Sequence, residues 1–219
     1  MKIISRFSAI LGCPTGYRLF SRLVTGRTWQ IFMADYVKPV TGEKVLDIGC
    51  GPADILNYLP KCDYTGFDIS PEYIAAAQKR FADRGRFFCN DVAQTTVERE
   101  RGTFHLVLAI GVLHHLDDET AGKLFDLAQL AMRPDGRLVT YDGCFVPGQS
   151  RIARWFLRHD RGNFIRARPE YVRLASARFA KVDDHLRHDL LRIPYTHLIM
   201  RCTDPVPAGD KSNQSAPAL

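Results

Sequence analysis

Apolar runs and amphipathic segments alternate along most of this 219-residue chain. From Glu43 onward, short runs rich in β-branched and aromatic residues are separated by longer segments whose apolar positions repeat at helical spacing. This alternation predicts βα units around a mostly parallel sheet with helices on both faces. A sheet covered on both faces requires nearly continuous hydrophobicity in its strands. The predicted strands are residues 44–49, 64–69, 86–91, 104–111 and 137–143.

Two helices between these strands have clear boundary signals. Ser70 and Pro71 predict the N-cap and first turn of a helix over residues 71–80. A second helix is predicted over residues 118–132, closed by a Pro- and Gly-containing turn at 133–136. Both helices would cross over between parallel strands, which is the connection that such a sheet requires.

The flanks of this alternating region predict three further parts. Residues 1–40 are expected to form an N-terminal cap of one or two amphipathic helices, and residues 41–203 the main domain. Within that domain, an insertion over about residues 145–180 holds a predicted helix at 151–158 and another after Pro169.

The last part of the chain predicts a terminal strand pair and a tail. The strands are expected at residues 181–192 and 195–202, with Pro194 interrupting them. Residues 204–219 are rich in Pro, Ala, Ser and Gly, which predicts a disordered tail. The whole chain is 46% hydrophobic and 25% charged, as in an ordinary globular domain, and it lacks the apolar run of about 20 residues that a spanning helix needs.

Charge is distributed unevenly along the chain, although the formal net charge is only +6. Residues 1–30 contain five basic residues and no acidic ones, and residues 31–150 have a net charge of −5. Residues 151–192 have 11 basic and 5 acidic residues, a net charge of +6. Two basic segments therefore flank an acidic middle, and they would steer an anionic small molecule toward any site that they cover.

A glycine-rich turn follows the first predicted strand. The sequence VLDIGCGPADIL, residues 45–56, places Asp47 near the end of the strand and Gly49 and Gly51 in the turn, with a helix expected to begin near Ala53. Such a turn brings backbone amides and a helix N-terminus to the carboxyl edge of the sheet, where open α/β sheets bind ligands. On its own the turn is weak support for a site, because strand–turn connections often contain glycine.

Polar residues at the ends of the next two strands strengthen this interpretation. Asp68 ends the second strand, 21 residues after Asp47, and suits a carboxylate that accepts hydrogen bonds from both hydroxyls of a ribose. Asp91 and Val92 lie at the end of the third strand, where a carboxylate and a backbone amide can bind the amino edge of adenine. Three successive strands thus end in polar groups at one crevice.

With these residues, the sequence resembles the class I S-adenosylmethionine-dependent methyltransferases, especially the small-molecule type with a DxGCGxG turn. The resemblance covers about residues 40–143. It implies a Rossmann-like, seven-stranded, mostly parallel sheet whose last strand is antiparallel, with residues 195–202 as the candidate. It also implies S-adenosylmethionine as the cofactor. Ala53 stands where the family has a third glycine.

The resemblance assigns cofactor contacts residue by residue. Asp47 would support the turn, Asp68 would hold the ribose, and Asp91 with Val92 would contact the adenine amino group. The remaining expected contacts, which line the methionine, ribose and adenine portions, are Gly49, Cys50, Gly51, Ile69, Ile110 and Gly111.

Two adjacent histidines, His114 and His115, follow the fourth strand and are the candidate catalytic residues. Imidazole accepts a proton near neutral pH, so either ring suits a general base for methyl transfer. The alternative is that one histidine only packs beside the next helix. Methyl transfer demands little else from side chains beyond alignment of the reacting atoms.

Residues near the acceptor are less sharply defined by the sequence. Tyr17 from the N-terminal cap and Tyr141 at the end of the fifth strand are candidates, as are Arg151 and Arg154 from the second basic segment. The alternatives are a tyrosine at the rim of the sheet and solvated or ion-paired arginines. No metal site is expected, because the HxxH pair at 185 and 188 lies among aspartates in a predicted strand.

The leading hypothesis is an enzyme that methylates an oxygen, nitrogen or carbon atom of a small metabolite, with an anionic acceptor as one expectation. A membrane-surface enzyme acting on a lipid or quinone precursor, an RNA methyltransferase and a non-catalytic cofactor-binding protein remain alternatives. No nucleic-acid partner is expected under the leading hypothesis, and the chain would be a monomer or homodimer. Six scattered cysteines without metal-ligand spacing predict reduced thiols and a cytoplasmic protein.

Overall fold

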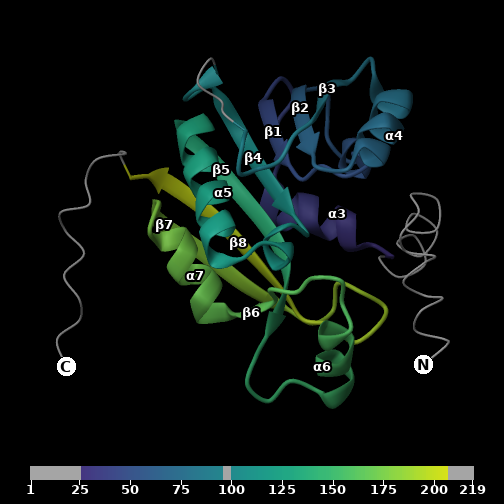
Figure 1. The fold of residues 1–219 in the computed structure, drawn as a ribbon, viewed down its shortest axis with the longest axis vertical. Coiled ribbons are helices and arrows are strands. Elements are labelled where there is room, and N and C mark those ends of the chain that lie inside the picture. Colours follow the sequence, from purple (N-terminus) through teal and green to yellow (C-terminus); the bar gives the residue numbers. More distant parts are fainter. Residues whose placement is uncertain (1–25, 96–99, 207–219) are drawn as a thin grey trace.

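A single mixed sheet organises the computed structural model, which describes residues 26–95 and 100–206 (Figure 1). Its strand order is β3-β2-β1-β4-β5-β8-β7, and β8 alone runs antiparallel to both of its neighbours. These strands are β1 (Lys44–Ile48), β2 (Asp63–Asp68), β3 (Gly85–Cys89), β4 (Phe104–Ile110), β5 (Met132–Phe145), β7 (Phe179–Arg187) and β8 (His197–Pro205). The two-residue β6 (Arg166–Ala167) pairs with the end of β5. The predicted Rossmann-like sheet with an antiparallel last strand is confirmed.

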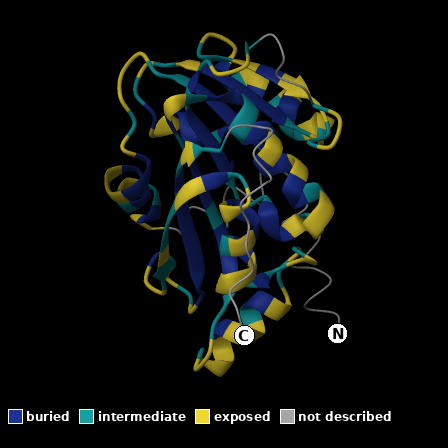
Figure 2. Ribbon diagram, turned by 90° about the vertical axis from the view of Figure 1, so that its left-hand side faces the viewer, coloured by how far each residue is buried: buried dark blue, intermediate teal, exposed yellow. Residues whose placement is uncertain are grey.

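Helices cover both faces of this sheet. On one face, α5 (Asp118–Ala131) and α7 (Arg168–Ser176) share a buried cluster with strand residues such as Leu46 and Val107. On the other, α4 (Pro71–Phe81), α3 (Thr28–Phe32) and the π-helical turn η1 (Met33–Val37) pack with the alternate strand residues, including Val45 and Leu106. Figure 2 shows the resulting pattern, with buried strands between helices whose outer sides are exposed.

The N-terminal helical segment is fixed to the sheet at its far end by one arginine. Arg137 of β5 donates to the carbonyl oxygens of Val37 and Lys38 at 2.8 and 3.0 Å, and it pairs with Glu43 at 2.8 Å. Although partial burial opposes ionisation of Glu43, the bond and charge of Arg137 keep the pKa of this carboxyl lowered. The cap predicted over residues 1–40 is thus represented by residues 28–37, and residues 1–25 lie outside the described part.

Serine residues cap the first turns of two helices, α4 and α6 (Arg151–Arg158). Ser70 accepts a hydrogen bond from the Tyr73 amide at 3.2 Å, as expected for the N-cap of α4. Ser150 does the same for α6, through the Ala153 amide at 3.1 Å. The predicted helices at 151–158 and after Pro169 are both present, the latter as α7.

Several predicted boundaries are wrong, among them the end of the strand expected over residues 181–192, because β7 ends at Arg187. Residues 133–136 do not form a turn between helix and strand, because β5 begins directly after α5 and Met132 pairs with Phe104. They instead form an irregularity in the strand, after which Arg137 pairs with Leu106. The helix expected near Ala53 is only the single 3₁₀ turn η2 (Asp54–Asn57). The last strand continues to Pro205, so it includes the first residues assigned to the tail.

Within residues 26–95 and 100–206, the helices are all too short or too polar to pass through a bilayer. The five cysteines in this part of the chain are unpaired thiols: Cys50, Cys62, Cys89, Cys144 and Cys202.

Candidate functional site

The carboxylate of Asp68 joins the glycine-rich turn to the end of β2. Its Oδ2 atom accepts a hydrogen bond from the Gly51 amide at 2.9 Å, and Oδ1 accepts one from the Ser70 amide at 2.9 Å. A carboxylate has about four lone-pair positions, so two remain for other donors. The side chain is part-buried at the carboxyl edge of the sheet, where two ligand hydroxyls can reach it.

The three glycines around this edge differ in what surrounds them. All have positive φ, at +70° for Gly49, +54° for Gly51 and +69° for Gly111. A Cβ atom at Gly49 would lie 2.5 Å from Cγ2 of Val112, so this glycine is required by packing against the protein itself. A Cβ at Gly51 would meet no heavy atom within 4 Å, and one at Gly111 would meet only His114 at 3.7 Å. Gly51 and Gly111 therefore leave open space against which a ligand can lie.

Ala53 adopts the left-handed conformation that the family fills with glycine, at φ 55° and ψ 35°. It is fully buried, and its amide donates to the Cys50 carbonyl oxygen at 2.9 Å. The turn therefore keeps its shape without the third glycine, at the conformational cost of a left-handed non-glycine residue.

Beneath the turn, Asp47 is almost completely buried and accepts a hydrogen bond from the Tyr64 hydroxyl at 2.6 Å. Its second oxygen, Oδ1, has no partner among the described residues. Burial raises the pKa of Asp47 to about 7, and the nearby Asp68 adds to this effect, whereas the Tyr64 bond opposes it. Tyr64 was not predicted as a site residue, since in the sequence it is only an aromatic in a strand.

The expected adenine region lies at the ends of β2 and β3. Ile69 is 69% exposed beside Asp68, which leaves its side chain open to a flat ligand. Asp91 accepts a bond from the Ala93 amide at 2.8 Å, and Val92 packs partly buried against the cluster under α5. The adenine contacts assigned to these three residues stay predictions.

The two histidines of the 3₁₀ turn η4 (Leu113–His115) have different surroundings. His114 is buried, and both its amide and its Nδ1 atom approach Asp142 Oδ1, at 3.2 and 2.8 Å. Its Nε2 atom lies 3.6 Å from Asp160 Oδ1. Burial opposes protonation, but the bond to Asp142 and the charges of Asp142 and Asp160 outweigh it and raise the pKa of His114.

His115 is exposed, with its ring 4.2 Å from that of His114 between centroids. Partial desolvation and the charge of His114 lower the pKa of His115 to about 4. At neutral pH this imidazole is uncharged, so it has a nitrogen lone pair for accepting a proton. The structure thus separates the histidine pair into a carboxylate-bound ring and an accessible neutral ring.

Two residues that the sequence analysis missed complete the surroundings of His114. Tyr195, which precedes β8, donates from its hydroxyl to Asp160 Oδ2 at 2.9 Å. Its ring packs on His197, 4.6 Å between centroids, and burial lowers the pKa of His197 to about 3. No motif marks Asp160 or Tyr195, because only the fold brings the end of α6, the start of β8 and η4 together.

An aromatic wall continues from this group toward the N-terminal helix. Tyr141 stacks on His197 at 4.4 Å between centroids and lies 5.3 Å from Phe32 and 6.2 Å from Trp29. Trp29 in turn lies 6.0 Å from Tyr58. The position of Tyr141 agrees with its expected place at the end of β5, although a role in acceptor binding stays a prediction. Tyr17 lies outside the described residues.

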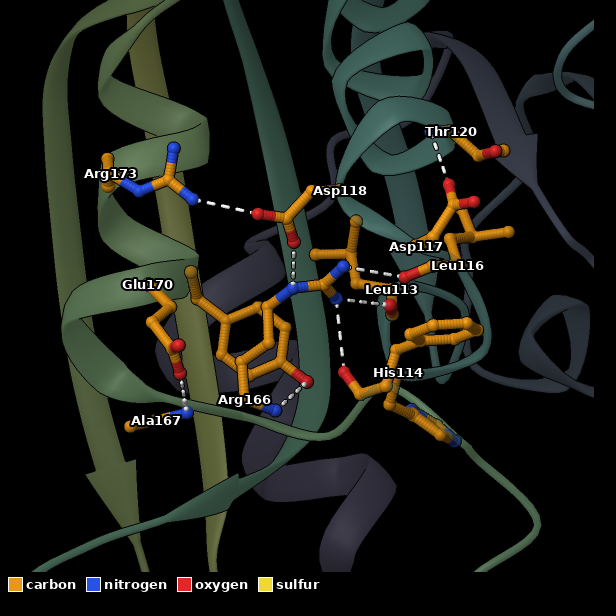
Figure 3. A network of polar contacts seen from close by, with 12 residues as sticks. Leu113, His114, Leu116, Asp117, Asp118, Thr120, Arg166, Ala167, Glu170 and Arg173 are labelled. Atoms are coloured by element: carbon orange, nitrogen blue, oxygen red, sulfur yellow. Dashed lines mark hydrogen bonds and ion pairs between the residues drawn. The ribbon is translucent and has the colours of Figure 1, made fainter.

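A buried arginine from the insertion holds η4 in place (Figure 3). Arg166 donates to the carbonyl oxygens of Leu113 and Leu116 at 2.9 and 2.6 Å, and to Asp118 at 2.8 Å. Arg173 of α7 reaches the other oxygen of Asp118 at 2.8 Å. The sequence analysis treated Arg166 only as part of a basic segment, whereas it satisfies carbonyl groups that the short 3₁₀ turn leaves free.

Several other arginines of the second basic segment form ion pairs at the surface. Arg168 binds Asp184, Arg178 binds Asp126 and Arg187 binds Asp189. Arg151 and Arg154 lie exposed on α6 instead, and neither forms an ion pair within residues 26–95 and 100–206. Their expected role in acceptor binding stays a prediction.

No cluster of metal-ligating side chains exists in the part of the chain that the structure describes. The HxxH pair noted in the sequence is separated by its contacts. His185 packs on Tyr36, 5.2 Å between centroids, and His188 approaches the Thr196 hydroxyl at 3.1 Å through Nδ1.

Comparison with known families agrees with this geometry. A family model described as "Methyltransferase domain" matches residues 45–136, from the first strand through the irregular start of β5. The segment 45–136, less than half of the chain, is therefore similar in sequence to methyltransferase domains. The matched segment contains the glycine-rich turn, Asp68, Asp91 and both histidines, whereas the insertion and the last two strands lie outside the match.

Curated relatives align with part of this chain and over part of their own length. An uncharacterised protein of Synechococcus is 34% identical over 97 residues, which are 41% of this chain and 22% of that protein. A hybrid PKS-NRPS synthetase of Aspergillus flavus is 39% identical over 110 residues, covering 44% of this chain and 3% of the synthetase. The chain therefore spans less than a quarter of the length of either relative.

Solved structures show the same fold over most of the chain. A TehB-like S-adenosylmethionine-dependent methyltransferase of Corynebacterium glutamicum has a TM-score of 0.59 at 18% identity, covering 81% of this chain and 86% of its own. A geranyl diphosphate C-methyltransferase of Streptomyces coelicolor scores 0.60 at 16% identity, covering 79% and 78%. A Haemonchus contortus phosphoethanolamine N-methyltransferase scores 0.65 at 16% identity, covering 93% and 57%.

Proposed function

We propose that this chain transfers a methyl group from S-adenosylmethionine to an oxygen, nitrogen or carbon atom of a small-molecule acceptor. The observation that carries the proposal is the Asp68 carboxylate, which is joined to Gly51 and still has two lone-pair positions at the carboxyl edge of the sheet. Structural neighbours solved with S-adenosylmethionine or S-adenosylhomocysteine support this choice of cofactor.

The residues at the crevice fit such a cofactor. Asp68 would accept hydrogen bonds from the two ribose hydroxyls. Gly51 and Gly111 leave space beside their backbone for the methionine and ribose portions of the cofactor. The unpartnered Asp47 Oδ1 beneath the turn is a buried acceptor that a ligand amino group or a bridging water would satisfy. Ile69 offers an exposed apolar side chain for the adenine ring. When bound, the cofactor supplies a sulfonium methyl group that is already electrophilic.

The chain itself would align the acceptor and remove its proton. His115, neutral at pH 7 because its pKa is about 4, is the proposed general base where the acceptor atom carries a proton. His114 has a carboxylate near each ring nitrogen, so we assign it to positioning η4 and orienting its neighbour. Tyr141 and Trp29 would exclude water from one side of the site.

For the acceptor, an anionic group remains the proposed feature. Two structural neighbours are named for phosphorylated compounds, geranyl diphosphate and phosphoethanolamine, and both share only the fold with this chain. The net positive charge of residues 151–192 supports steering of such a group.

Calorimetric titration with S-adenosylhomocysteine, followed by transfer of labelled methyl groups into a fractionated cell extract, tests the proposal. We expect binding that Asp68→Ala weakens, and labelling of a small organic fraction by the wild type. Labelled RNA would instead identify a nucleic-acid methyltransferase, and binding without labelling of any fraction would favour a non-catalytic protein.

A further inference from the structure

The helix α6 differs from the other helices in what it exposes. Its buried side consists of Ala153 and Leu157, which pack toward the end of β5. Its outer side presents Ile152, 59% exposed, and Trp155, 49% exposed, next to basic side chains. Figure 1 places α6 at one end of the molecule, apart from the helices that cover the sheet. Covering these two side chains with another surface would remove apolar area from water, which is favourable in free energy.

Three arginines follow the same outer side. Arg151, Arg154 and Arg158 are spaced by three and four residues, so they lie along one face of the helix, and all are exposed. None of them forms an ion pair within residues 26–95 and 100–206, in contrast to Arg168, which binds Asp184. Their charges are thus available to a partner, and α6 itself contains no acidic residue.

The other strongly exposed apolar residues also lie in identifiable places. Ile69 and Phe88 are at the ends of β2 and β3, beside the proposed adenine region. Phe164, 42% exposed, belongs to the loop that follows α6. Of the five remaining exposed apolar side chains among the described residues, three lie on α6 and the loop that follows it, namely Ile152, Trp155 and Phe164. The other two, Val40 and Tyr58, lie elsewhere.

We propose that α6 is an interfacial anchor that binds the chain to the surface of an anionic lipid bilayer. An amphipathic helix with Trp and aliphatic residues beside Arg lies in the bilayer interface, where the apolar groups enter the headgroup region and the guanidinium groups bind lipid phosphates. Indole rings favour this depth in particular.

Two other occupants fit the surface less well. A second copy of the chain packed through the same face would bring Arg151, Arg154 and Arg158 against the same three arginines, and like charges would repel. A nucleic acid would bind the arginines and stack on Trp155, but the exposed Ile152 contributes to neither interaction. Only a surface that is both anionic and apolar uses all five side chains.

The geometry also places the anchor beside the proposed active site. Asp160 follows α6 by two residues, pairs with Tyr195 at 2.9 Å and lies 3.6 Å from His114. A chain held by α6 would therefore have the His114 end of its crevice near the bilayer. If the proposed methyl transfer is correct, this position favours an amphiphilic acceptor that reaches the site from the membrane; the anchoring itself does not depend on that activity.

Vesicle binding of the full chain tests the anchor. Binding would be measured by co-sedimentation with two kinds of vesicle. One consists of phosphatidylcholine alone, and the other also contains about 30 mol% phosphatidylserine as the anionic lipid. We expect binding that requires the anionic lipid. The variant Arg151→Gln/Arg154→Gln/Arg158→Gln should bind about 100-fold more weakly, because each basic residue near such a surface strengthens binding about fivefold. The variant Ile152→Ser/Trp155→Ser should bind at least about tenfold more weakly while keeping all its charge.

A matched control is Arg168→Gln/Arg173→Gln/Arg178→Gln, which removes three arginines from the α7 region and should bind vesicles nearly as well as the wild type. Since Trp29 and Trp155 are the two tryptophans of the chain, Trp29→Phe leaves Trp155 as a single reporter, whose emission should shift to shorter wavelength on binding. Unchanged binding of both α6 variants would overturn the proposal and assign any membrane affinity to another part of the chain. Loss of binding in the arginine variant but not in Ile152→Ser/Trp155→Ser would also overturn it, since attraction would then be purely electrostatic.

The outcome is separable from the proposed function. Calorimetry with S-adenosylhomocysteine on the same α6 variants reports cofactor binding, which we expect to be unchanged. Vesicle binding without cofactor binding would reject the methyltransferase proposal and support the membrane anchor. Cofactor binding without vesicle binding would reject the membrane anchor and support the methyltransferase proposal.

Discussion

Asp68 illustrates how a single side chain can serve both the fold and a ligand. In the structure it bonds to two backbone amides, those of Gly51 and Ser70, and so holds the glycine-rich turn against the start of α4. The same carboxylate is the proposed acceptor for ribose hydroxyls. A substitution at this residue is therefore expected to affect the turn and the ligand together.

For Asp68→Ala we expect cofactor affinity to fall by roughly 10- to 150-fold, because a hydrogen bond to a charged group contributes about 1.5–3 kcal/mol. Calorimetric titration with S-adenosylhomocysteine measures the change. Asp63→Ala, at the exposed start of the same strand, removes the same charge far from the turn and should leave the affinity unchanged. Equal affinities for Asp68→Ala and wild type would disprove the assigned cofactor site.

His114 and Asp142 give a residue-scale prediction about pH. Because the folded-state pKa of His114 is raised, protonated His114 stabilises the fold at pH values below its unfolded pKa of about 6.5. This stabilisation is lost as the pH rises through the folded-state pKa. The difference in unfolding free energy between wild type and His114→Gln should thus be largest near pH 5.5 and smaller at pH 8.5, as measured by urea denaturation.

Removing the charge of His114 should also change its neighbour. His115 titrates at about 4 partly because His114 repels a second proton, so its pKa should rise in His114→Gln, as measured by NMR titration of the ring protons. A stability difference that does not vary with pH, together with an unchanged His115 titration, would contradict the assigned network.

The residues that sequence analysis identified share a property that those it missed do not. Gly49, Gly51 and Asp68 lie within a few residues of strand ends, where local pattern alone places them at the carboxyl edge. Asp160, Tyr195 and Arg166 come from the insertion and the segment before β8, and they reach η4 only through tertiary packing. Gly49 also has a structural role that the sequence did not indicate, since its missing Cβ makes room for Val112, while its predicted cofactor contact stays a prediction.

Among the structural elements, η4 depends most on support from elsewhere. It is one 3₁₀ turn of three residues, so its own hydrogen bonds are few. Arg166, brought in by the short strand β6, binds the carbonyl oxygens of Leu113 and Leu116. The position of both histidines thus depends on a segment about 50 residues later in the chain.

Arg166→Met is expected to destabilise the fold by about 3 kcal/mol or more, since it leaves the buried carbonyl oxygens of Leu113 and Leu116 without their charged donor and removes one of the two arginines that bind Asp118. Arg173→Met is the matched control, because Arg173 binds the same Asp118 from an exposed position and should cost about 0.5 kcal/mol. Urea denaturation of both variants gives the comparison. Similar losses for the two variants would show that Arg166 acts only through its surface ion pair.

Element boundaries were predictable where a local signal decides them. Ser70 caps its helix as expected, and Ser150, which was not predicted as a cap, acts in the same way on α6, because an N-cap hydroxyl acts within three residues. Residues 133–136 have the composition of a turn, yet pairing of Met132 with Phe104 draws them into β5. Ala53 likewise occupies a left-handed conformation that its own preference disfavours, because the turn before it is fixed by hydrogen bonds to Phe67 and Asp68.

In the whole molecule, the sheet order brings the proposed cofactor region and the insertion to the same edge from opposite halves. Strands β1, β2 and β4 contribute the glycine-rich turn, Asp68 and Gly111, whereas β5 and β8 carry Tyr141 and His197. A ligand in the crevice would therefore contact several elements that unfold together.

Binding of S-adenosylhomocysteine is thus expected to stabilise the entire fold. At a free concentration 100 times the Kd, the unfolding free energy should increase by about 2.7 kcal/mol. Differential scanning calorimetry measures this as a concentration-dependent rise in Tm. At the same ligand concentration Asp68→Ala should show a much smaller rise, and an identical rise would place the ligand elsewhere on the molecule.

The location of Asp160 has a thermodynamic consequence for the molecule. This carboxylate lies two residues beyond Arg158, at the end of α6, and it raises the pKa of His114 from 3.6 Å away. Any load on α6 that draws Asp160 away from the ring would lower that pKa and release the proton more readily. Binding free energies are reciprocal, so the protonation state of His114 must change the affinity of α6 for its partner by the same factor. Proton release measured during vesicle binding would therefore report the coupling between the surface of the chain and the centre of its site.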